Sequence, residues 1–124
     1  MTFNYTDKQL NNLNRDNGVY SVNSEFARRK HKKLVVNKPD SELASYETNT
    51  ITTSDGQEFR VVATKSDPVT GFDGLAVAPI VNGEPDYKNV AVIAAGTDPD
   101  SPTKTDRCKT TFSYYSVIYS NLIV

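Results

Sequence analysis

Side chains that carry most catalytic chemistry are scarce in this sequence. It has one cysteine, Cys108, one histidine, His31, and no tryptophan. A single cysteine excludes an intramolecular disulfide and a cysteine-rich metal site, and it leaves the redox compartment open. The motif G-x-S-x-G, which presents the nucleophile of many serine hydrolases, does not occur. The sequence therefore predicts no catalytic residue, no cofactor and no metal ligand.

An excess of charge of one sign and long apolar runs are also lacking. Fourteen lysines and arginines oppose fifteen acidic residues, which gives a formal net charge of −1. Without a long-range field, the bulk charge implies no nucleic-acid partner. No run approaches the roughly 18 apolar residues of a transmembrane span, and residues 1–17 hold no apolar signal-peptide core. We expect no transmembrane segment, and a protein that is cytoplasmic or exported by a signal-less route.

The N-terminal part of the sequence contains two short patterns that favour helices. Thr6 and Gln9 fit a capping box, which predicts a helix from about Asp7 to Arg15 that stops at Asn17-Gly18. Ser24 is the N-cap candidate of a second segment, helical or irregular, whose residues available for burial are Phe26 and Ala27.

The middle of the chain favours strands. Segments 49–53 and 57–64 flank Ser54-Asp55-Gly56, a strong hairpin signal, and the alternation places Phe59, Val61 and Ala63 on one face. Residues 34–48, in contrast, are expected to be a surface connection. Pro79 in the strand 75–81 predicts an edge position or a bulge. The apolar run 90–95 predicts a strand covered on both faces.

The fold class that follows is α/β or α+β, in a single domain over residues 1–124. N-terminal helices precede a β-hairpin and further strands. The tail 112–124 is aromatic and β-branched, and it is expected to be a strand, or an uncovered adhesive tail.

Two neighbouring segments resemble a known enzyme family. They read GFDGLAVAPIVNG (71–83) and VAVIAAGTDPD (90–100), and they are similar to the opening strands of lipase-like α/β-hydrolases of Gram-positive bacteria, including modules exported by type VII secretion. YTDKQL (5–10) and VYSV (19–22) resemble the start of such modules. The similarity covers residues 5–101 and leaves 102–124 as a divergent tail. It implies a truncated N-terminal fragment of a serine hydrolase, catalytically incomplete on its own.

The resemblance also implies a role for Gly96 and Thr97, which follow the apolar run 90–95. In lipases of this type, the backbone N–H of the residue after the glycine stabilises the oxyanion, a role that falls here to Thr97, and Gly96 lets the backbone approach closely. The alternative is that these residues merely end a strand. A nucleophile, an acid and then a histidine would have to follow, whereas His31 lies upstream.

Three other features have both a structural and a chemical interpretation. His31 lies in the basic run Arg28–Lys33, which is typical of a solvated face and alternatively of an anion site. Cys108 lies between two cations that would lower a thiol pKa, but a free thiol is favoured over a nucleophile because no histidine follows. The loop acids are taken as solvated, with a loose cation site as the alternative; they are Asp98, Asp100 and Asp106.

A second hypothesis comes from a different functional class. The chain is then a small α+β protein-interaction module that forms homodimers or binds a protein partner through its strand edges and its apolar tail, Val117 to Val124.

Overall fold

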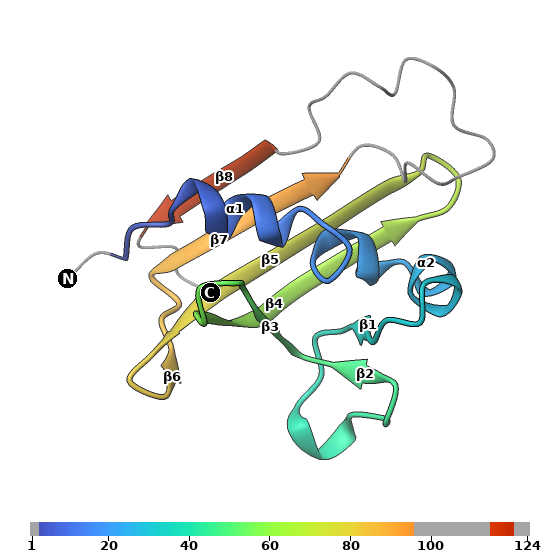
Figure 1. The fold of residues 1–124 in the computed structure, drawn as a ribbon, viewed down its shortest axis with the longest axis horizontal. Helices are drawn as coiled ribbons and strands as arrows, with labels where there is room; N and C mark the ends of the chain where they lie inside the picture. Colours follow the sequence, from blue (N-terminus) through green and yellow to red (C-terminus); the bar gives the residue numbers. More distant parts are fainter. Residues whose placement is uncertain (1–2, 96–114, 121–124) are drawn as a thin grey trace.

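The computed structural model describes residues 3–95 and the backbone of residues 115–120. Short helices and two sheets make an α+β fold (Figure 1). In chain order the elements are α1 (Asp7–Leu13), the 3-10 helix η1 (Val19–Val22), α2 (Ser24–Arg29), β1 (Leu34–Val35), the 3-10 helix η2 (Asp40–Glu42), β2 (Glu47–Thr48), β3 (Thr50–Thr52), β4 (Glu58–Asp67), β5 (Phe72–Val81), β6 (Glu84–Pro85), β7 (Asn89–Ala95) and β8 (Tyr115–Ser120).

Helix α1 begins at the predicted capping box. The Thr6 hydroxyl accepts from the Gln9 backbone N–H, and the Gln9 side chain accepts from the Thr6 N–H, each at 3.0 Å. The helix ends at Leu13, before the predicted Arg15. Its buried face is short, and only Leu13 and Gln9 are buried.

Helix α2 has a different cap from the predicted one. Asn23, and not Ser24, accepts the backbone N–H groups of Glu25 and Phe26, at 2.9 and 3.0 Å. Phe26 and Ala27 are buried, as the sequence predicts. The helix stops at a left-handed residue, His31, with φ of 58°.

The larger sheet has the strand order β3-β4-β5-β7-β8, with every neighbouring pair antiparallel. The predicted β3–β4 hairpin is confirmed, and Ile51 pairs with Phe59 across it. The segment 90–95 is a strand, as predicted, and forms most of β7, which lies between β5 and β8. The predicted cover on both faces is not seen among the described residues, because Val92 and Ala94 are partly exposed. The segment 115–120 of the tail is a strand, as the sequence predicts.

The prediction that Ala63 shares a face with Phe59 and Val61 is wrong. Between Val61 and Ala63 the β4–β5 register shifts by a β-bulge, so Ala63 pairs with Ala76 and is exposed. The extra residue in β4 reverses the alternation of side chains beyond it.

The prediction of an edge position for the strand containing Pro79 is also wrong, because β5 lies at the centre of the sheet. Pro79 pairs with Phe59 on the β4 side. On the other side the β7 ladder ends at Val77 and the β6 ladder begins at Ile80, so Pro79 falls between the two. A residue without an N–H is tolerated where no ladder needs its donor.

Residues 34–48 are more ordered than a surface connection. Leu34 and Val35 of β1 pair in parallel with Glu47 and Thr48 of β2. Val35 and Glu47 are buried. The intervening residues, including η2, loop out from this two-stranded sheet and return (Figure 1).

The core lies on one face of the larger sheet. Helix α1 and the η1 segment cross in front of that sheet in Figure 1. The buried cluster joins them to the strands; its members are Leu13, Val19, Tyr20, Val22, Phe26, Val35, Ile51, Phe59, Val61, Leu75, Val77, Ala91, Ile93 and Ala95.

The opposite face of the sheet, here called the second face, is also apolar. Alternation along β5 and β7 places on it Ala76, Ala78, Ile80, Val90, Val92 and Ala94. Ala78 and Val90 are buried, and the other four are partly exposed. No helix of the described residues covers this face (Figure 1).

Gly18 gives the first test of the fold. A Cβ atom there would lie 2.1 Å from the carbonyl oxygen of Leu13, which is backbone and cannot rotate away. We expect Gly18→Ala to lower the free energy of unfolding by roughly 2–4 kcal/mol in urea titrations followed by circular dichroism. The control is Gly71→Ala, at φ 77° with open space around it, where only backbone strain of about 1 kcal/mol applies. Equal losses in the two variants would contradict the steric account.

Candidate functional site

The strand end predicted to lead into an oxyanion turn is the carboxyl end of β7. Ala95 is fully buried and pairs with Asp73 of β5. Since β7 is held between β5 and β8, the chain leaves the sheet from an interior strand. Such a position is rigid, as an electrostatic donor requires.

A polar pair lies beside this strand end. Asp73 is 3% exposed and accepts a hydrogen bond of 2.7 Å from the Ser66 hydroxyl of β4, its register partner. Asp73 and Ala95 share the core face, so the carboxylate lies at the limit of the apolar core. The sequence reasoning missed this residue, because one aspartate in a loop-like string carries no burial signal.

The predicted site residues themselves lie outside the described part of the chain. These are the donor candidates Gly96 and Thr97, the thiol Cys108, and the acids Asp98, Asp100 and Asp106. Their predicted roles remain predictions. The structure provides the strand that leads to Gly96.

His31 is on the surface, as its basic neighbours suggest. It is exposed and occupies the left-handed position after α2. The Lys32 N–H donates to the Ala27 carbonyl at 2.8 Å and the His31 N–H donates to the Arg28 carbonyl at 3.3 Å, the pattern of a Schellman cap.

A Ser–carboxylate pair such as Ser66–Asp73 lacks the histidine that transfers the proton in a triad. The described residues thus contain no assembled nucleophile and base.

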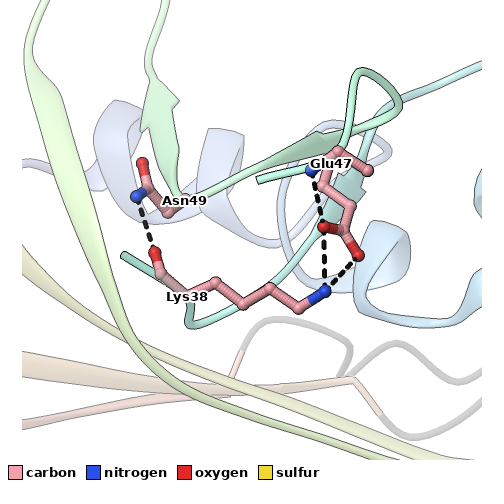
Figure 2. Close-up of polar contacts among 4 residues, drawn as sticks. Lys38, Glu47 and Asn49 are labelled. Carbon is pink, nitrogen blue, oxygen red and sulfur yellow. Dashed lines mark hydrogen bonds and ion pairs between the residues drawn. The ribbon is translucent and has the colours of Figure 1, made fainter. Parts of the chain in front are cut away.

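A polar cluster around Lys38 and Glu47 was not foreseen from the sequence. Figure 2 shows Lys38 reaching across to Glu47, whose two carboxylate oxygens accept from its ammonium at 3.0 and 2.9 Å. One of these oxygens also accepts from the Ala44 N–H at 3.0 Å. The N–H of Ala44 and the ammonium of Lys38 lower the pKa of the buried Glu47 carboxyl, and the same contact raises the pKa of Lys38.

Asn49 extends the cluster to the larger sheet. Its side-chain amide donates to the Lys38 carbonyl and to an Asp40 carboxylate oxygen, each at 2.8 Å. The Arg60 guanidinium of β4 donates to the same Lys38 carbonyl at 3.3 Å. The cluster closes the loop between β1 and β2 and ties it to the sheet. The Lys38 ammonium, the Glu47 carboxylate and the Asn49 amide N–H groups are paired within the cluster, which indicates a structural clasp and not a ligand site.

Two further contacts position the N-terminal segment. The Gln9 amide donates to Asp55 in the β3–β4 turn at 2.9 Å. The Tyr5 hydroxyl donates to the Asn89 carbonyl at 2.6 Å. Burial, with Asp86 nearby as a smaller cause, raises the pKa of Tyr5, so this phenol remains a neutral donor.

Metal and membrane signals are absent from the part of the chain that the structure describes. Within residues 3–95, no three His, Cys, Asp or Glu side chains gather as a metal site. The described helices include none long and apolar enough to cross a membrane. Comparison with protein-family models, curated proteins and solved structures finds no match to this chain.

The Lys38–Glu47 clasp predicts a pH dependence of stability. The folded-state pKa of Glu47 lies below its ordinary value of 4.5. The contribution of the Glu47 carboxylate to the free energy of unfolding is therefore full above pH 4.5, and it is lost as the pH falls through the folded-state pKa. We expect the urea midpoint of the wild type to fall more steeply between pH 6 and pH 3 than that of Glu47→Gln, which is already less stable at pH 6.

The matched control is Glu84→Gln, an exposed glutamate in β6. It should follow the wild-type pH curve. If the urea midpoints of wild type and Glu47→Gln change in parallel with pH, this carboxylate does not contribute to the pH dependence of stability.

Proposed function

We propose that this chain is the N-terminal portion of a lipase-like serine hydrolase that is catalytically incomplete alone. The observation that carries the proposal is the second face, which is apolar across β5 and β7 and has no helix over it among the described residues. Sheets of α/β enzymes are covered on both faces. A sheet with one helical layer and two apolar faces is what the start of such a domain would present.

The carboxyl end of β7 supports the same proposal. The resemblance places the oxyanion donor directly after this strand, and β7 is an interior strand whose last residue, Ala95, is fully buried. In the proposed enzyme, the Thr97 N–H stabilises the tetrahedral oxyanion, while Gly96 permits close approach. The reaction is acyl transfer through a serine that a downstream segment supplies.

Esterase activity tests this proposal. We expect the chain alone to show no hydrolysis of p-nitrophenyl butyrate and no labelling by a fluorophosphonate. A frameshift would explain the divergent tail 102–124, and on that explanation the DNA beyond codon 101 should encode a G-x-S-x-G segment in another reading frame. A chain extended through that frame should hydrolyse the ester, and Thr97→Pro, which removes the N–H, should lower kcat by about 10²–10³-fold.

Two results would contradict the proposal. One is that no reading frame of the DNA beyond codon 101 encodes a G-x-S-x-G segment. The other is serine-independent hydrolysis by the chain alone that disappears in Cys108→Ala, which would assign the chemistry to the thiol instead. Thr97→Ser, which keeps the N–H and a hydroxyl, is the matched control for the proline variant.

A second candidate function has its own observation. Strand β8 of the tail lies at the edge of the larger sheet, and its described neighbour is β7 alone. An open edge of this kind can add a strand from another chain. On this candidate, the protein is a small interaction module that forms homodimers through β8.

Light scattering coupled to gel filtration separates the two candidates. The interaction module predicts a dimer for the full chain and a monomer when residues 110–124 are deleted, with near-native circular dichroism in both. A full-length chain that stays monomeric at all concentrations would exclude the homodimer.

A further inference from the structure

A strongly basic surface lies at the carboxyl end of α2, and neither candidate function above uses it. Residues 25–33, here called the basic corner, contain five cations, Arg28, Arg29, Lys30, Lys32 and Lys33, and one acid, Glu25. The local charge is therefore +4, whereas the rest of the chain holds nine basic and fourteen acidic residues and carries −5. This separation of charge is far larger than the net charge of −1 suggests.

The fold keeps these cations at the surface. All are exposed except Lys32, which is partly buried. Phe26 and Ala27 anchor the helix in the core. The left-handed turn at His31 then ends the helix, so the cations before and after it surround one helix end. The Arg29 guanidinium lies over the Phe26 ring, 5.4 Å from the ring centroid, which helps to orient this side chain.

An apolar residue projects at the same end of the molecule. Val69 is 90% exposed at the turn between β4 and β5, the most exposed of the large hydrophobic side chains in the described residues. In Figure 1, this turn and α2 both lie at the right-hand end of the long axis. The turn is closed by the Gly71 N–H, which donates to the Asp67 carbonyl at 2.8 Å, so Val69 is presented on a formed hairpin.

We propose that this end of the protein docks on an anionic lipid surface, with the basic corner facing the headgroups and Val69 entering the interface. Clustered lysines and arginines are attracted to anionic bilayers, and each contributes roughly a fivefold increase in partitioning. The acidic remainder of the chain is repelled, which fixes the orientation. Nucleic acid fits less well, because the basic corner has no exposed aromatic side chain for base stacking and Val69 would gain nothing there.

Vesicle co-sedimentation of the full chain tests the docking surface. The protein should bind phosphatidylcholine vesicles that contain phosphatidylglycerol, and high salt should release it. It should not bind vesicles of phosphatidylcholine alone. Reversing two cations in Lys30→Glu/Lys33→Glu should lower partitioning at least about tenfold. Val69→Ser should lower it severalfold, since it removes the apolar contact.

The matched control is Lys8→Glu/Lys88→Glu, which makes the same change in net charge at exposed lysines elsewhere on the chain. It should change binding far less than the reversal in the basic corner. Circular dichroism confirms that each variant is folded. Equal losses in the two double variants, absence of binding to anionic vesicles, or stronger binding to a DNA duplex than to vesicles would each overturn the proposal. These outcomes are separate from the esterase test, because docking needs no catalytic residue.

Discussion

Tyr5 lies against the ring of Phe59, with ring centroids 5.6 Å apart, and its hydroxyl donates to the Asn89 carbonyl. Through this contact the N-terminal segment is fixed across β4 and β7, and α1 and η1 then cover one face of the larger sheet, while α2 joins the same core through Phe26. The whole core depends on this single covering layer. The second face has no such layer among the described residues, and that asymmetry underlies the proposed function.

Local chemistry made much of the fold predictable. The capping box at Thr6, the Asp55-Gly56 hairpin and the apolar run of β7 are each short-range signals, and the structure confirms them. The errors came from long-range pairing. The bulge near Val62 and the central position of Pro79 depend on which strand lies alongside, which no local pattern of side chains specifies.

The candidate site was predictable to a smaller extent. The sequence located the strand that leads to Gly96, but it gave no sign of Asp73 or of the clasp between Lys38 and Glu47. Both depend on residues that meet only after the sheet forms. The net charge of −1 likewise gives no indication of the basic corner, whose cations lie together at the surface because Phe26 anchors α2 in the core.

The proposed function requires the second face to be an apolar contact surface for further polypeptide. The most direct measurement is the fluorescence of 8-anilinonaphthalene-1-sulfonate with the folded chain, compared with Ala76→Lys/Ile80→Lys, two substitutions at partly exposed positions on that face. The account predicts strong dye binding to a chain with native near-ultraviolet circular dichroism, and much weaker binding to the folded variant. Absence of dye binding to the native chain, or equal binding to both proteins, would contradict it.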